Sequence, residues 1–159
     1  MYDVTFYFAH HYLEKGDRTI DQMVQAARSG KQNIAEGAAA GNTSKETEIK
    51  LTNVAKASLQ ELLVDYEDFL RVRGLEQWKP DDERLAQAKR ACATHNDSEF
   101  YRKAMPERSA ETIANIAITL IHQTDWLLNK LIEKLEIQFV ENGGVKEQMT
   151  KARKEYRGY

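Results

Sequence analysis

The chain has 159 residues, of which 42% are hydrophobic, 30% are charged and two are prolines. This composition is typical of one helix-rich globular domain that is long enough to bury a core. The net charge of −2 excludes a polycation, so any nucleic-acid binding has to come from a local basic patch or from assembly. Cys92 is the single cysteine, which excludes an internal disulfide, and no apolar run approaches the roughly 20 residues of a membrane span. Since no signal-peptide pattern follows Met1, we expect a cytoplasmic protein without a membrane partner.

The first two predicted helices cover residues 2–14 and 18–37. Thr19 and Gln22 have the spacing of a capping box at the start of the second helix, and Gly37 is expected to end it. The apolar positions of this second helix recur at helical spacing. Small residues lie between them and should let a neighbouring helix approach closely; they are Ala26, Ala27, Ser29, Gly30 and Ala35.

A third and longer helix is predicted from a capping box formed by Thr43 and Glu46 to about Arg73. At about 1.5 Å per residue it would be roughly 45 Å long, and its apolar positions continue to its end. Such a helix needs packing partners along its whole length. We expect Ala55 to face one of these partners at close range.

Residues 75–106 contain few large apolar side chains and are interpreted as a short helical insertion across the end of a bundle. Asp81 or Asp82 can cap a helix there that ends at about Thr94. The last long helix is predicted from its cap at Ser109 to about Glu141. We therefore expect a bundle over residues 1–142 and a basic C-terminal tail over residues 143–159. This tail has five basic and two acidic residues, a local charge of +3.

The last long helix carries apolar side chains over more than one face. A helix with this pattern has to be buried on more than one side. One stripe is enough for a monomeric bundle, so the surplus favours contacts between subunits. We expect a homo-oligomer with Trp126, Ile132 and Phe139 in its interface.

Two motifs together resemble a known protein family. NIAEG at 33–37 follows QAARS at 25–29, and Ala55, Ser58 and Glu61 begin an A-x-x-S-x-x-E-L spacing in the next helix. These features resemble the four-helix-bundle proteins first noticed as reading frames within intervening sequences of bacterial 23S rRNA genes. GGVKEQMTKAR at 143–153 is similar to the ending of the subgroup with an extra C-terminal segment. The motif residues, which we interpret as structural, are Asn33, Ile34, Ala35, Glu36, Gly37, Ala55, Ser58 and Glu61.

The resemblance implies an all-α, up-down four-helix bundle that assembles into a ring of five. It also implies kinship in fold with the accessory variability protein of diversity-generating retroelements, whose pentamer binds nucleic acid and a reverse transcriptase. The family has no established enzymatic activity. This chain departs from the family at residues 29–31, where Ser-Gly-Lys replaces the usual Ser-Ile-Pro, so the kink that a proline would impose is in doubt.

The sequence offers little catalytic chemistry. Carboxylate-bridged di-metal bundles need Glu-x-x-His pairs, and none of the four histidines has a glutamate three residues earlier. Cys92 and His95 share a helix face but would supply only two ligands of the three or four that a metal site needs. Asn33 and Glu36 have two interpretations, a recognition site or hydrogen-bond partners for the start of the next helix, and we favour the second. We expect no enzymatic activity, no cofactor and no metal.

The basic residues support two functional hypotheses. In the first, the chain is a homo-oligomeric adaptor that binds RNA, DNA or a nucleic-acid enzyme. In the alternative, it is a protein–protein interaction scaffold that touches no nucleic acid. Glu46 and Glu48 lie among the lysines of the third helix, as on an ordinary solvated face, and this keeps the alternative open. The candidate nucleic-acid-binding residues are Arg18, Arg28, Lys31, Lys45, Lys50, Lys151, Arg153 and Lys154.

Overall fold

The computed structural model describes residues 1–158, which form helices and the turns that connect them, without a strand. The prediction of an all-α chain is therefore confirmed. In chain order the elements are α1 (Tyr2–Tyr12), α2 (Arg18–Ala40), α3 (Lys45–Val72), α4 (Glu83–Thr94), α5 (Ser98–Ala104), the 3-10 helix η1 (Met105–Glu107), α6 (Ala110–Asn142) and α7 (Val145–Arg157).

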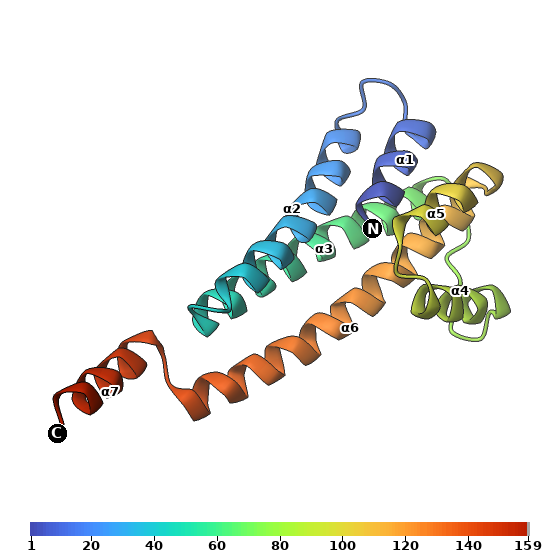
Figure 1. Cartoon of the computed structure of the whole chain (residues 1–159). Coiled ribbons are helices and arrows are strands. Elements are labelled where there is room, and N and C mark those ends of the chain that lie inside the picture. Colours follow the sequence, from blue (N-terminus) through green and yellow to red (C-terminus); the bar gives the residue numbers. More distant parts are fainter. Residues whose placement is uncertain (159) are drawn as a thin grey trace.

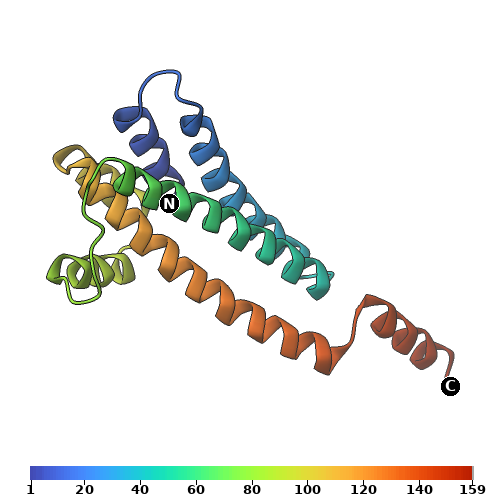
Figure 2. The ribbon, with the colours of Figure 1, turned by 180° about the vertical axis from the view of Figure 1, so that it is seen from behind.

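Helix α3 is central to the arrangement, with α2 packed along one side and α6 along another (Figures 1 and 2). Both neighbours run antiparallel to α3. Helix α1 packs against α2 and α6, but its 11 residues span only about 16 Å, whereas the 23 residues of α2 span about 35 Å. It therefore lies beside the first half of α2 only (Figure 1). Within the predicted insertion, α4 packs against α6 and α5 packs against α1.

The core is built where α1, α2, α3 and α6 meet, and its largest fully buried side chain is Tyr66 of α3. The Tyr66 hydroxyl donates a hydrogen bond to Thr5 Oγ1 of α1 at 3.0 Å. The rings of Phe8 and Tyr66 lie 4.9 Å apart, and those of Phe8 and Phe69 lie 4.7 Å apart. Burial raises the pKa of the Tyr66 phenol, so this side chain stays a neutral hydrogen-bond donor. The short helix α1 is thus fixed to α3 by both aromatic packing and one buried hydrogen bond.

The contact between α2 and α3 is close because small residues lie on the facing side of α2. Ala27 of α2 and Ala55 of α3 are both buried, as the sequence predicts. A Cβ atom at Gly30 would lie 3.2 Å from Leu59 Cδ2, and one at Gly37 would lie 3.3 Å from Leu51 Cβ. These distances are tighter than most side-chain contacts, so the two helices approach each other over glycine.

Gly37 does not end the second helix, and that prediction is wrong. Helix α2 continues to Ala40, and Gly41 forms its C-cap with its N–H donated to the Gly37 carbonyl oxygen at 2.9 Å. The physical reason is the close approach described above. Gly37 meets α3 inside the last turns of α2, so its lack of a side chain serves packing and not chain reversal.

Both predicted capping boxes are also wrong by one or two residues. The N-cap of α2 is Asp17, whose Oδ1 accepts a hydrogen bond from the Thr19 N–H at 2.8 Å. The N-cap of α3 is Ser44, whose Oγ accepts from the Thr47 N–H at 3.2 Å, while the Thr43 hydroxyl donates to Ala40 O. Adjacent Asp, Ser and Thr residues can all cap a helix, so the sequence did not distinguish between them. Asp82 and Ser109 cap α4 and α6 as predicted.

We predict that Ala27→Leu and Ala55→Leu each destabilise the chain by about 1–3 kcal/mol, because a larger side chain would overpack the contact between α2 and α3. The two alanines are 1% and 0% exposed. Thermal unfolding followed by circular dichroism measures the effect.

Ala35→Leu and Ala57→Leu are matched controls, since both alanines are exposed on the same two helices. Their melting temperatures should stay near that of the unchanged chain. Equal effects in the buried and exposed pairs would contradict the close-contact interpretation.

Candidate nucleic-acid interface

The eight candidate basic residues lie in separate places on the structure. Arg18 is the first residue of α2, and Arg28 and Lys31 follow it by about 15 and 20 Å along the helix axis. At about 100° per residue, Arg28 and Lys31 lie only about 60° apart around the helix, as surface neighbours, whereas Arg18 lies about 80° and about 140° from them. The Lys31 Nζ lies over the Tyr2 ring, 5.2 Å from its centroid. Arg18 is therefore separate from the pair formed by Arg28 and Lys31.

The two candidate lysines at the start of α3 are already paired with carboxylates. Lys45 Nζ lies 3.1 Å from Glu48 Oε2, and Lys50 Nζ lies 2.7 Å from Glu46 Oε1. The hydrogen bond from Lys50 lowers the pKa of Glu46, so this carboxylate stays charged and balances the lysine. Phosphate contacts by these lysines would have to compete with the existing ion pairs. They are weaker candidates than their charge suggests.

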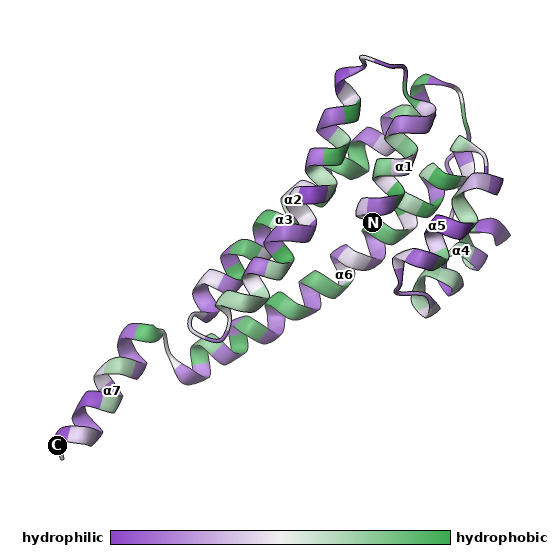
Figure 3. Cartoon of the chain, turned by 45° about the horizontal axis from the view of Figure 1, so that its top comes forward, coloured by the Kyte–Doolittle hydropathy of each residue, from purple (hydrophilic) through white to green (hydrophobic). Residues whose placement is uncertain are grey.

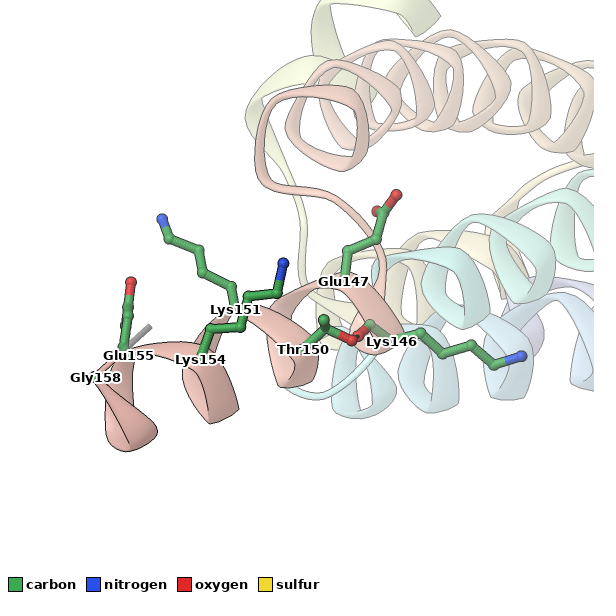
Figure 4. A pocket seen from close by; sticks show the side chains of 7 residues that line it. All are labelled: Lys146, Glu147, Thr150, Lys151, Lys154, Glu155 and Gly158. Atoms are coloured by element: carbon green, nitrogen blue, oxygen red, sulfur yellow. Dashed lines mark hydrogen bonds between the residues drawn. The ribbon is translucent and has the colours of Figure 1, made fainter.

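Helix α7 holds the remaining three candidates, Lys151, Arg153 and Lys154, and it has no buried residue. Together with Lys146 and Arg157 it carries five cations, and none of them forms an ion pair within residues 1–158. In Figure 4, Lys151 and Lys154 project to the same side of the helix and Lys146 extends in another direction. Helix α7 is thus an exposed basic helix with cations on more than one side.

The sequence patterns described above assign residues 143–159 to a basic tail, whereas the structure has the helix α7 at Val145–Arg157. The signals were present: Val145, Met149 and Tyr156 recur at helical spacing, and Glu147 is three residues after Gly144. In the structure the Gly144 N–H donates to Glu147 Oε2 at 2.6 Å, which helps to start the helix. Gly143 has a φ of 70°, a conformation that favours glycine, and this residue turns the chain between α6 and α7.

The first turn of α7 lies against the main body of the structure. Phe139 of α6 packs on Gly144, where an added Cβ would lie 3.4 Å from the Phe139 ring. A small cavity of about 110 Å³ lies between this junction and the loop from α2 to α3, with Lys45 among its lining residues. Beyond this point α7 extends away from the other helices (Figure 1).

The three predicted interface residues differ in exposure. Trp126 is 61% exposed, whereas Ile132 and Phe139 are half-buried. Hydrophobic residues recur along the whole of α6 (Figure 3), but none of the helices in residues 1–158 has the length and apolar character that a membrane crossing requires. Three further apolar side chains of α6 are more than half exposed and were not in the predicted interface; they are Leu127, Ile137 and Val140.

The family-motif residues lie mainly at the contact between α2 and α3. Ser58 and Ser29 share a hydrogen bond at 2.8 Å between their hydroxyl oxygens, and Ala55 is buried one turn away.

The Asn33 amide donates to the Ser29 carbonyl oxygen at 2.9 Å, so the interpretation that it binds the start of the next helix is wrong. The Glu36 side chain is exposed and makes no hydrogen bond within residues 1–158. The other motif positions are Ile34, which is half-buried, Gly37, which is buried, and Ala35 and Glu61, which are exposed.

Cys92 and His95, the two possible metal ligands, have different environments in the structure. Cys92 is buried, and burial raises the pKa of its thiol. The His95 ring stacks on Phe100 at a centroid distance of 3.7 Å. Within residues 1–158 no group of three or more His, Cys, Asp or Glu side chains could hold a metal ion.

Comparisons of the chain with protein-family models, curated proteins and solved structures give no match. The resemblance to the intervening-sequence proteins therefore stays a prediction from the motifs.

We predict that the backbone amides of α7 exchange with solvent much faster than those of α3 and α6. An isolated helix of 13 residues is only marginally stable in water, and α7 buries no side chain that would stabilise it. Hydrogen–deuterium exchange followed by mass spectrometry measures this difference within one sample, with the core of α6 as the internal control. Protection of α7 equal to that of α3 would mean that another surface covers α7 in solution.

Proposed function

We propose that the chain is a non-enzymatic, homo-oligomeric helical adaptor that binds nucleic acid through α7. In this proposal α1, α2, α3 and α6 act as an up-down four-helix bundle that presents α7 to a partner. The observation that carries the proposal is the set of five cations on the exposed helix α7, none of which has a carboxylate partner among residues 1–158.

The cations of α3 and α7 differ in whether a carboxylate already balances their charge. The lysines at the start of α3 have carboxylate partners within 3.1 Å, whereas the cations of α7 face solvent. Binding of each free cation to a phosphate releases a counterion from the nucleic acid, and such contacts add in their effect on affinity. The net charge of −2 opposes non-specific attraction by the whole chain, so binding would be concentrated at α7.

Assembly is the second part of the proposal. Trp126, Ile137 and Val140 are 61%, 59% and 81% exposed on α6, which is more apolar surface than a solvated helix usually leaves uncovered. Contacts between copies would bury these side chains and would repeat the basic helix around the assembly. The family resemblance favours five copies in a ring.

A second candidate function is a protein–protein scaffold without nucleic-acid binding. The observation that favours it is the apolar stripe of α7, in which Val145, Met149 and Tyr156 are 41%, 51% and 93% exposed. A groove on a partner protein could bind this stripe, with the basic residues at its edges. The two functions differ in their dependence on salt.

We predict that the chain binds duplex DNA or single-stranded RNA of random sequence at low salt, and that the affinity falls steeply as salt rises. The triple variant Lys151→Gln, Arg153→Gln, Lys154→Gln should bind more weakly, with a logarithmic salt slope reduced by about 2–3 because three phosphate contacts are lost. Fluorescence anisotropy over a salt series measures both quantities.

The matched control is Arg71→Gln, Lys103→Gln, Lys130→Gln, which removes the same charge from three cations that are paired with carboxylates. This control should keep the slope of the unchanged chain. If the unchanged chain is not retained by either nucleic acid at low salt, the nucleic-acid function is wrong and the scaffold remains.

We predict that the chain forms a particle larger than a monomer. Size exclusion coupled to light scattering should give about 92 kDa for a pentamer of the 18.3 kDa chain. Trp126→Glu should shift the particle toward the monomer while it stays helical, because a carboxylate would have to be desolvated in the contact. A mass of one chain for the unchanged protein would contradict the assembly. Unfolding of Trp126→Glu would place Trp126 in the intramolecular packing.

A further inference from the structure

The insertion leaves a large cavity between α4, the connector that precedes it and the first half of α6. Only two residues of α4 are buried, Ala88 and Cys92, and both are small. The cavity lined by the connector, α4 and α6 has a volume of about 960 Å³, within the range of sites that hold small organic molecules.

Hydrogen bonds fix the walls of this cavity in place. The buried Asn115 of α6 accepts from the Trp78 N–H at 2.8 Å and donates to the Glu76 carbonyl oxygen at 2.8 Å. On the other side, Gln123 Nε2 of α6 donates to the Lys89 carbonyl oxygen of α4 at 3.0 Å. The connector and α4 are therefore both attached to α6 at the cavity.

The apolar part of the lining is aromatic. The chain has two tryptophans, Trp78 and Trp126, and both line this cavity, together with Leu85 and Leu127. Indole rings favour planar aromatic ligands, because such ligands can stack on them or pack edge to face. The lining thus favours an aromatic ligand over a flexible aliphatic one.

The polar part of the lining favours a negative charge. It includes Lys89 and His122, and none of the residues that line the cavity is acidic, although the chain has 25 acidic residues. Lys89 has no carboxylate partner within residues 1–158. The Trp78 Nε1–H is buried and has no hydrogen-bond acceptor within residues 1–158.

We infer that this cavity binds an aromatic carboxylate. The aromatic body packs among Trp78, Trp126 and the two leucines, and the Lys89 ammonium balances the charge of the carboxylate. This site is independent of the proposed function of α7. Trp126 is shared with the predicted interface between copies, but Trp78 and Lys89 are not. Variants of Trp78 and Lys89 therefore test the site, and Trp126→Glu tests the assembly.

Isothermal titration calorimetry with the full chain tests the inference, with 4-biphenylacetate as the probe and its neutral amide, 4-biphenylacetamide, as the matched ligand. The carboxylate should bind at least about tenfold more tightly than the amide, because a charge-assisted contact is stronger than a neutral one. Lys89→Gln should remove this preference and leave binding of the amide within about twofold. Trp78→Ala should weaken both ligands by about tenfold, because both lose the aromatic packing on the indole ring.

Lys79→Gln is the control for charge. Lys79 follows Trp78 in the connector, is exposed and does not line the cavity. It should leave both affinities unchanged. Far-ultraviolet circular dichroism establishes that each variant keeps its helices. Absence of binding at millimolar probe, equal binding of the two ligands, or a preference that survives Lys89→Gln would each overturn the inference.

Discussion

The close contact between α2 and α3 is the constraint on which the rest of the structure depends. Two helices can approach this closely only where one of them presents Gly or Ala, and α2 does so at Ala27, Gly30 and Gly37. The hydroxyls of Ser29 and Ser58 add a polar contact to the same face. With α2 and α3 fixed as a pair, α6 packs along α3 and α1 completes the core through its aromatic residues.

Much of the fold could be predicted because its helices are long and strongly periodic. The span of α3, the cap of α6 at Ser109 and the burial of Ala27 and Ala55 all follow from spacing and residue size. Helix boundaries were less certain, since Asp17 and Ser44 compete with neighbouring residues that could also cap. Gly37 was misinterpreted because a glycine that ends a helix and one that permits helix contact look alike in one sequence.

The candidate site was harder to predict, because a sequence gives charges but not their partners. Lys45 and Lys151 carry the same charge, yet only the structure separates the ion-paired lysine from the exposed one. The cavity beside α4 had no sequence signal at all. Its lining comes from the connector, α4 and α6, and these segments meet only in three dimensions.

The position of the two tryptophans determines what intrinsic fluorescence can report. Both indoles line the cavity bounded by the connector, α4 and α6, and neither is among the core side chains of α1, α2 and α3. Emission therefore follows the docking of the insertion, while circular dichroism follows the helices of the whole chain. If α4, with its two small buried residues, detaches before the core unfolds, the two signals will have different denaturation midpoints. The difference between those midpoints would measure how strongly the insertion is coupled to the rest of the fold.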